Sequence, residues 1–266
     1  MKLARLLLPF LLTVLASSVQ AETINCAPIT SLPAVISTQG LYCLTGNLAT
    51  AQTDGNAITI NANNVTLDLN GWKVGGQAAG TATQAAGIYS DAVNVTVKNG
   101  ITRGFYIGIE LHGRGAVVRD MLVDQNTYIG IDVHGQGAVV EHNQVVDTGG
   151  STNGSTVPAW GVEVVAEGST VSNNVVSGLT SRGAGEIGIH VPGTNSTVRG
   201  NVVSDSAKPS AATSYGIWQA NGIAVNNTVS NFMGGIFSYA GIYAHNTAYN
   251  CFTPYMGGTA GAGNSP

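Results

Sequence analysis

An internal repeat constrains the fold of this 266-residue chain more than any other feature of its sequence. Each copy opens with Gly or Ala followed by Ile or Val. It continues through a variable residue, an aliphatic residue and a turn, and it ends in a second Val-rich run. The clearest copies are GIELHGRGAVVRDMLVD (108–124) and GIDVHGQGAVVEHNQVVD (130–147). The opening aliphatic residue recurs at intervals of 19–31 residues, at Ile58, Ile88, Ile109, Ile131, Val162, Ile189, Ile217 and Ile236. One copy is too short to bury its own apolar side chains, so the copies must stack.

The composition agrees with short strands joined by turns. Hydrophobic residues make up 44% of the chain and charged residues 9%, whereas a disordered chain needs low hydrophobicity and high charge. Within each copy the apolar residues alternate, which is typical of strands whose Ile and Val side chains point into a shared core. Asparagines recur at one position of successive copies and predict a ladder of stacked, hydrogen-bonded side chains, at Asn143, Asn174, Asn201, Asn227 and Asn246.

The copies lack the helical segments and the Leu spacing of leucine-rich repeats, so each is predicted to be a coil of short strands. In this the chain resembles the right-handed parallel β-helix superfamily, the pectate-lyase-like fold with NosD-type repeats, over about residues 55–250. The resemblance implies an all-β, right-handed parallel β-helix (solenoid) of about eight coils with an N-terminal cap. It implies no single activity, because one fold hosts many functions. The local motifs of pectate lyases, the paired aspartates of polygalacturonase-like hydrolases and the DPHD motif of alginate epimerases are all missing.

Residues 1–21 have the pattern of a secretory signal peptide. Two basic residues precede an apolar run at residues 6–15, and Val19 and Ala21 fit a cleavage site. Export to the periplasm or out of the cell is therefore expected, and it permits disulfides. No later stretch reaches the ~20 apolar residues of a membrane span, so no span is expected.

The remaining sequence divides into three parts. Residues 22–54 resemble the N-terminal cap of such solenoids, and a Cys26–Cys43 disulfide would fasten it. Residues 55–252 hold the repeats and are predicted to form the parallel β-helix. Residues 253–266 are rich in Gly and Ala and are predicted to be a flexible C-terminal tail.

The outward positions of the first strand in each copy carry most of the reactive side chains. The residue between the two inward aliphatics faces outward by alternation, and so does the residue two positions later. At the centre of the face these positions are Glu110, His112, Asp132, His134, Glu163 and His190. Neighbouring strands lie ~4.8 Å apart, so these residues should form one patch. Stacked like charges are destabilising, and the acids therefore need a cation, a shared proton or a protonated histidine.

We expect all six residues of this patch to be catalytic. Glu110, Asp132 and Glu163 are also expected to be able to ligate Ca²⁺, which prefers oxygen ligands. The mixture of histidines and acids would also suit a transition-metal ion, although the chain has only four methionines and no His-rich run, which argues against a copper carrier. The alternative is an ordinary solvated face whose charges keep a long sheet soluble.

Aromatic and basic residues near the patch are candidates for substrate binding. Tyr89 and Trp218 flank it on the same face, and Arg119, on the next strand, is a further candidate for holding an acidic substrate. Asp91 is assigned to a turn outside the patch. Three insertions precede first strands and are expected to wall a groove beside the patch, at residues 148–160, 178–186 and 205–215.

Two classes of function remain open on this reading. The first is an exported carbohydrate-active enzyme, a lyase or a hydrolase, which acts on a polysaccharide. The alternative is a non-catalytic glycan-binding or surface-structural solenoid. A nucleic-acid partner is not expected, because ten Lys and Arg against fourteen Asp and Glu leave no basic footprint.

Overall fold

The computed structural model describes residues 25–205 and 213–266. The signal peptide expected at residues 1–21 lies outside the described residues. Apart from one 3₁₀ turn, η1 (Gln77–Ala79), every regular element in the described ranges is a β-strand. Within these ranges no helix has the length and apolar character needed to cross a membrane.

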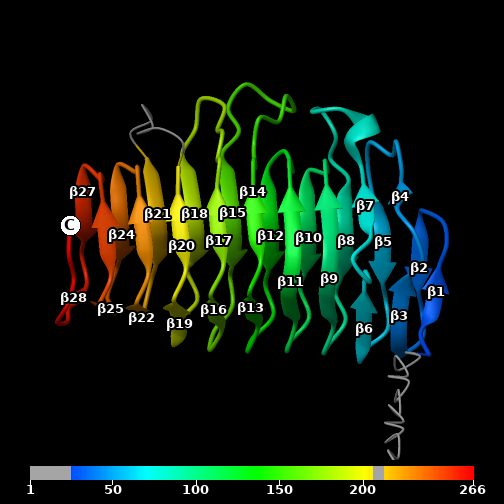
Figure 1. Ribbon diagram of the computed structural model, residues 1–266, viewed down its shortest axis with the longest axis horizontal. Coiled ribbons are helices and arrows are strands. Elements are labelled where there is room, and N and C mark those ends of the chain that lie inside the picture. Colours follow the sequence, from blue (N-terminus) through cyan, green and yellow to red (C-terminus); the bar gives the residue numbers. More distant parts are fainter. Residues whose placement is uncertain (1–24, 206–212) are drawn as a thin grey trace, which may run out of the picture.

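The strands form two sheets that wind around a common core (Figure 1). The ten-stranded sheet contains β2 (Ala34–Ile36), β5 (Asn56–Ile60), β8 (Ala86–Ser90), β10 (Ile107–Leu111), β12 (Ile129–Val133), β15 (Ala159–Val164), β18 (Glu186–Val191), β21 (Ser214–Gln219), β24 (Gly234–Ser238) and β27 (Thr253–Met256). The eighteen-stranded sheet contains β1 (Ala27–Ile29), β3 (Gly40–Leu44), β4 (Leu48–Ala49), β6 (Val65–Asp68), β7 (Lys73–Gly75), β9 (Thr96–Arg103), β11 (Val117–Asp124), β13 (Val139–Glu141), β14 (Gln144–Val146), β16 (Thr170–Ser172), β17 (Val175–Ser177), β19 (Ser196–Arg199), β20 (Val202–Ser204), β22 (Gly222–Val225), β23 (Thr228–Ser230), β25 (Ile242–Ala244), β26 (Thr247–Tyr249) and β28 (Thr259–Ala260).

Each strand pairs in parallel with the equivalent strand of the next coil. Between β10 and β12, for example, Ile109 pairs with Ile131 and Glu110 with Asp132. The opening aliphatic residues of all eight predicted copies are fully buried, so they form one continuous apolar column, as the alternation predicts. The right-handed parallel β-helix predicted from the repeats is confirmed.

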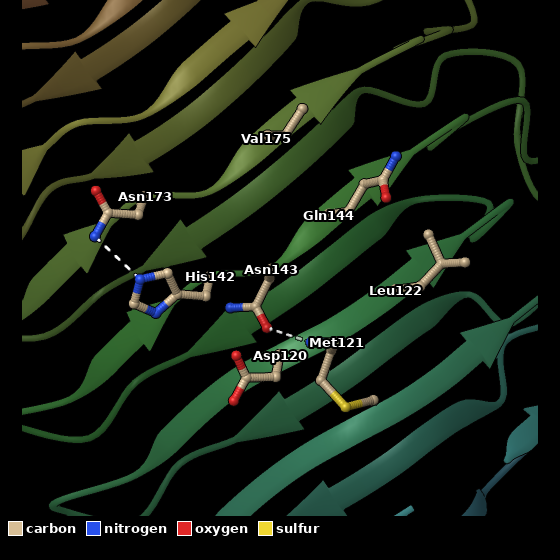
Figure 2. Close-up of a pocket in the computed structure, with 8 residues that line it drawn as sticks. All are labelled: Asp120, Met121, Leu122, His142, Asn143, Gln144, Asn173 and Val175. Atoms are coloured by element: carbon tan, nitrogen blue, oxygen red, sulfur yellow. Dashed lines mark hydrogen bonds between the residues drawn. The ribbon is translucent and has the colours of Figure 1, made fainter. Parts of the chain in front are cut away.

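The asparagine ladder is confirmed, and it lies inside the helix rather than on its surface. Asn143 donates through its backbone N and its Nδ2 to Asn174 Oδ1, at 3.0 Å in both cases. The same pair of bonds links Asn174 to Asn201, Asn201 to Asn227 and Asn227 to Asn246. At the start of the ladder, Asn143 Oδ1 accepts from the backbone N of Met121 at 3.1 Å (Figure 2). The ladder thus replaces the backbone bonds that the coils cannot make where the chain turns.

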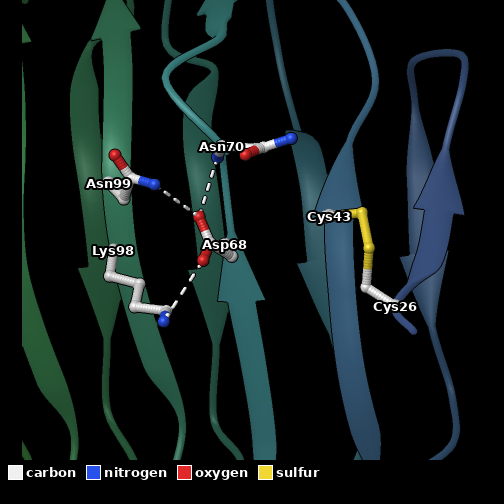
Figure 3. Close-up of a disulfide and its surroundings, with 6 residues drawn as sticks. All are labelled: Cys26, Cys43, Asp68, Asn70, Lys98 and Asn99. Atoms are coloured by element: carbon white, nitrogen blue, oxygen red, sulfur yellow. Dashed lines mark hydrogen bonds and ion pairs between the residues drawn. A yellow bond between two sulfur atoms is a disulfide. The ribbon is translucent and has the colours of Figure 1, made fainter. Parts of the chain in front are cut away.

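The N-terminal cap is itself part of the solenoid. Strand β1 pairs with β3, and β2 begins the ten-stranded sheet by pairing with β5. Cys26 and Cys43 form the predicted disulfide, with their Cα atoms 5.8 Å apart (Figure 3). In the coil next to Cys43, Asp68 makes an ion pair with Lys98 at 3.2 Å and accepts hydrogen bonds from Asn70 and Asn99.

The C-terminal segment differs from the prediction. Residues 253–266, expected to be a flexible tail, instead form β27 and β28 and extend both sheets. Asn264 Oδ1 accepts from the backbone N and the Nδ2 of Asn246, so the ladder gains a further member. The glycines that suggested flexibility serve tight turns instead, because Gly257 and Gly263 have φ values of 65° and 74°.

Candidate active site on the ten-stranded sheet

Strand register brings the predicted patch together on the outward face of the ten-stranded sheet. The paired residues along one row are Tyr89, Glu110, Asp132, Glu163, His190, Trp218 and Phe237. His112 and His134 follow directly after the ends of β10 and β12. The chain therefore concentrates its outward acids, histidines and aromatic rings in the middle of one face.

Each acid of the patch lies against a histidine. Glu110 Oε1 is 3.1 Å from His112 Nε2, and Asp132 Oδ1 is 2.9 Å from His134 Nε2. The third pair crosses between strands, since Glu163 Oε1 and His190 Nδ1 form a hydrogen bond of 2.9 Å. These pairs offset the like-charge repulsion that a row of three carboxylates would otherwise cause.

Burial perturbs the ionisation of the patch. Asp132 and Glu163 are only 6% and 7% exposed. Burial raises the pKa of Glu110, and repulsion from Asp132 adds to this rise, whereas the His112 charge lowers it. Interaction with the Asp132 carboxylate raises the pKa of His134 above its ordinary value, against the opposite effect of burial. Perturbed pKa values of this kind, in groups that contact one another, are typical of functional sites.

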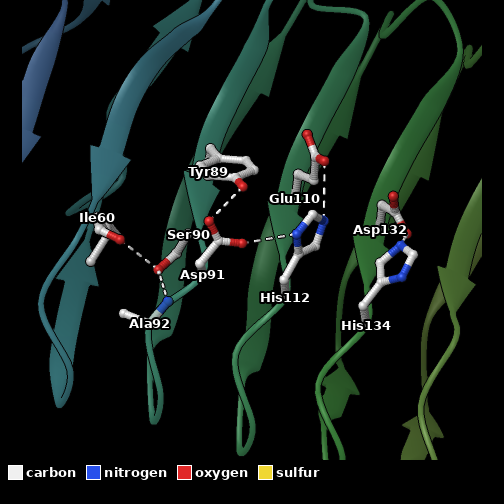
Figure 4. A network of polar contacts seen from close by, with 9 residues as sticks. All are labelled: Ile60, Tyr89, Ser90, Asp91, Ala92, Glu110, His112, Asp132 and His134. Carbon is white, nitrogen blue, oxygen red and sulfur yellow. Dashed lines mark hydrogen bonds and ion pairs between the residues drawn. The ribbon is translucent and has the colours of Figure 1, made fainter.

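Asp91 belongs to the patch, although the sequence assigned it to a turn outside. Its Oδ1 lies 3.0 Å from His112 Nδ1, and its Oδ2 accepts a 2.7 Å hydrogen bond from the Tyr89 hydroxyl (Figure 4). This hydrogen bond to Asp91 is the main cause that raises the pKa of Tyr89 to about 12. Asp91 stands two residues after Tyr89, as His112 stands two residues after Glu110. The outward alternation that identified His112 would therefore have identified Asp91 too.

Of a row of aromatic rings on the same face, the sequence identified Trp218 but not Trp160 or Tyr128. The Trp160 ring lies 5.2 Å from the His190 ring, and the Trp218 ring lies 4.7 Å from His190 on the other side. Tyr128 lies 5.9 Å from Trp160 and continues the row. Burial, with smaller contributions from Tyr106 and the nearby acids, raises the pKa of Tyr128 to about 12.

A shallow pocket of about 200 Å³ lies beside this aromatic row. The ends of all three predicted insertions contribute to its wall, together with residues of β15, β18 and β21. Its lining residues are Pro158, Trp160, Gly185, Ile187, Thr213 and Tyr215. The insertions thus border the aromatic part of the face, as expected, although residues 206–212 of the third insertion lie outside the described ranges.

Only one group of side chains in the described ranges offers clustered metal ligands. His112, Asp132 and His134 each place one ligand atom within 4.8 Å of the others. The three carboxylates expected to share Ca²⁺, those of Glu110, Asp132 and Glu163, do not form such a group there, because Glu110 and Glu163 turn toward their own histidines. The expected all-carboxylate ligand set is therefore replaced by a set of two imidazoles and one carboxylate.

Arg119 does not join the patch. It lies on β11 in the eighteen-stranded sheet, and its guanidinium contacts Asp120 at 2.9 Å. A separate open hollow of about 590 Å³ lies on that sheet, between Asp120, His142 and Asn173 (Figure 2). The His142 ring contacts Asn173 at 3.3 Å there. Neither residue belongs to the acid–histidine face, the part of the ten-stranded sheet that carries the patch of Glu110, His112, Asp132, His134, Glu163 and His190.

The sequence matches no protein-family model, and no curated protein matches it. Similar solved structures do exist. The Dettilon tailspike protein matches with a TM-score of 0.57 and 15% identity, over 89% of this chain and 58% of that one. A tailspike protein of E. coli bacteriophage HK620, solved in complex with a pentasaccharide, matches with a TM-score of 0.57 and 10% identity, over 79% of this chain and 44% of that one.

An enzyme is also among the similar structures. The A-module of the mannuronan C-5 epimerase AlgE4 of Azotobacter vinelandii matches with a TM-score of 0.54 and 11% identity, over 87% of this chain and 82% of the module. The chain spans only 58% and 44% of the two tailspike chains. At these identities the likeness concerns the fold, and the chain has the right-handed parallel β-helix fold.

Proposed function

We propose that this protein binds a polysaccharide along the outward face of the ten-stranded sheet and cleaves it there. The observation that carries the proposal is the Glu163–His190 pair, a 2.9 Å hydrogen bond flanked by the rings of Trp160 and Trp218. Aromatic rings pack against the apolar faces of sugars, and a histidine held by a carboxylate is a common general base.

The chemistry of the pair follows from its geometry. Glu163 accepts the hydrogen bond at His190 Nδ1, which leaves Nε2 available to take a proton from a bound sugar or from a water molecule. Because Glu163 is 7% exposed, it acts as the positioning residue, and His190, whose side chain is 16% exposed, is the group that a substrate can reach. Asp132, which pairs with Glu163 on the neighbouring strand, supplies a second carboxylate one coil away. Carboxylates at about that separation serve retaining glycosidases.

The fold supports a glycan rather than a small metabolite as substrate. A parallel β-helix presents a long open face, and the pocket beside Trp160 holds only about 200 Å³. One protein of similar fold was solved with a pentasaccharide. Export through the sequence at residues 1–21 is part of the proposal, since it would bring the protein to extracellular or periplasmic glycans.

A non-catalytic glycan-binding protein is the second candidate. It is favoured by the burial of Asp132 and Glu163, which leaves two of the three acids of the patch little exposed to a substrate. Both candidates place the sugar on the same tryptophans, and they differ in whether the glycan is cleaved.

The decisive experiment is a screen of polysaccharides with the purified protein. Absorbance at 235 nm detects the unsaturated ends made by a lyase, a reducing-sugar assay detects hydrolysis, and affinity electrophoresis detects binding alone. Trp160→Ala should abolish binding, whereas Trp72→Ala, a change at an exposed residue outside the ten-stranded sheet, should leave it intact. His190→Asn should abolish cleavage and retain binding. Binding without cleavage in the unmodified protein would favour the second candidate, and the absence of binding to every polysaccharide would refute both.

A further inference from the structure

Two histidines and a buried aspartate converge at the β10–β12 part of the acid–histidine face. His112, Asp132 and His134 lie side by side there, and each has one possible ligand atom within 4.8 Å of those of the other two (Figure 4). We propose that these residues bind a divalent transition-metal ion of the Zn²⁺ class. This inference goes beyond the proposed action on glycans: it shares only Asp132 with it, and it is tested without a sugar.

The buried carboxylate oxygen of the site lacks a hydrogen bond. Asp132 is 6% exposed, and its Oδ1 accepts no hydrogen bond although His134 Nε2 is 2.9 Å away. Two atoms this close without hydrogen-bond geometry fit ligands of one ion. Ligands ~2.1 Å from a tetrahedral Zn²⁺ are ~3.4 Å apart, so these two atoms would separate slightly on binding. A cation at this point would satisfy an oxygen that is otherwise costly to bury.

Side chains behind His112 hold its ring in the state that a metal requires. Asp91 Oδ1 lies 3.0 Å from His112 Nδ1 and is itself held by the Tyr89 hydroxyl at 2.7 Å. If Nδ1 carries the proton, Nε2 presents its lone pair to the site. Metal-ligating histidines are commonly fixed by a carboxylate in this way. Glu110 Oε1 contacts His112 Nε2 at 3.1 Å, so on metal binding Glu110 would turn away from this nitrogen or bind the same ion.

The ligand types favour a transition metal over Ca²⁺. Ca²⁺ takes six to eight oxygen ligands, whereas imidazole suits Zn²⁺ and its neighbours in the first transition row. Two imidazoles and one carboxylate would leave coordination positions for water, since the His134 side chain is 40% exposed. The ion would also reduce the repulsion between Glu110 and Asp132, which pair directly between β10 and β12.

The test is calorimetric titration of the full chain with ZnCl₂ after dialysis against EDTA. His134→Asn removes one ligand at a partly exposed position, and circular dichroism should report an intact fold. His142→Asn is the matched control, because it removes a histidine from the eighteen-stranded sheet, outside the site. Asp91→Asn tests the positioning of His112.

We expect the unmodified chain and the His142→Asn variant to bind one Zn²⁺ with equal affinity. His134→Asn should weaken binding by about 100-fold or more, and Asp91→Asn by ~10–100-fold. The visible absorption of bound Co²⁺ should shift in Asp91→Asn, which a purely structural role for Asp91 would not cause. Equal Zn²⁺ affinities in the unmodified chain and His134→Asn would overturn the proposal. So would the absence of Zn²⁺ binding, or binding of CaCl₂ but not of ZnCl₂.

Discussion

Removal of one asparagine from the middle of the internal ladder should destabilise the protein more than its size suggests. Asn174 is fully buried and bonds in both directions. Its Oδ1 accepts two hydrogen bonds from Asn143, and its Nδ2 donates to the Val140 carbonyl at 2.9 Å and to Asn201 Oδ1 at 3.0 Å. Asn174→Ala would remove all four bonds and put no water in their place.

The magnitude follows from the groups left without partners. Asn143 keeps the bond from its Nδ2 to the Val118 carbonyl, and Asn201 Oδ1 keeps the bond from the backbone N of residue 174. The backbone N of Asn143 and the Val140 carbonyl both lose the bond that they make to the Asn174 side chain. Each buried group left unsatisfied costs about 1–3 kcal/mol, so we expect a loss of about 2–6 kcal/mol in the free energy of unfolding.

Urea unfolding followed by circular dichroism measures this loss. Asn61→Ala is the matched control, because Asn61 is exposed and its substitution should change stability by less than about 0.5 kcal/mol. Asn264→Ala should lower the free energy of unfolding by less than Asn174→Ala. Asn264 is the last member of the ladder and has a ladder neighbour on one side only. Equal losses from Asn174→Ala and Asn61→Ala would show that the ladder does not stabilise the helix.

Three further predictions concern the core, the aromatic row and the cap. Ile131→Asp should abolish soluble expression, because it places an unpaired charge in the fully buried apolar column. Gln136→Ser, at an exposed turn, should leave soluble expression intact. Equal solubility of the two variants would mean that the strand register is wrong. Tyr128 should ionise only at about pH 12, so Tyr128→Phe should reduce the absorbance change at 295 nm near pH 12, while the contribution of Tyr89, whose pKa is also raised to about 12, remains. Because its folded pKa is raised above the ordinary value of 10.0, stability should fall as pH rises from 10 toward 12. Replacing both Cys26 and Cys43 by Ser should lower stability by about 3 kcal/mol, as expected for loss of a disulfide that closes a loop of this length.

The fold could be predicted from the sequence because a β-helix repeats one simple rule. Ile109, Ile131 and Val162 each open a copy, and parallel pairing requires that such residues align between coils. Once they align, the register of every outward neighbour is determined. The acid–histidine row was therefore predictable, whereas the C-terminal coil was not. Its glycines are equally common in flexible tails, and the pairing of β27 and β28 with both sheets and the bond from Asn246 to Asn264 are features of the folded structure alone.

The aromatic row escaped prediction because the strands depart from strict alternation at a glycine. Counting back from the outward Glu163 places Val162 inward, Gly161 outward and Trp160 inward. In the structure, a Cβ on Gly161 would collide with the buried side chain of Val176, so both Gly161 and Val162 face the core. The extra inward residue turns Trp160 to the outward face, beside His190.

The same departure recurs along the helix and shapes the whole candidate site. A Cβ on Gly130 would meet Val145, and one on Gly188 would meet Val203, so these glycines also face the core. From β8 to β21, each strand of this sheet thus uses one glycine to present two outward side chains, one before the glycine and one after the following aliphatic residue. The first positions give an apolar and aromatic row, and the second give the acids and histidines. Only the combination of the two rows places ring faces beside proton-transferring groups, which is what the proposed action on a polysaccharide requires.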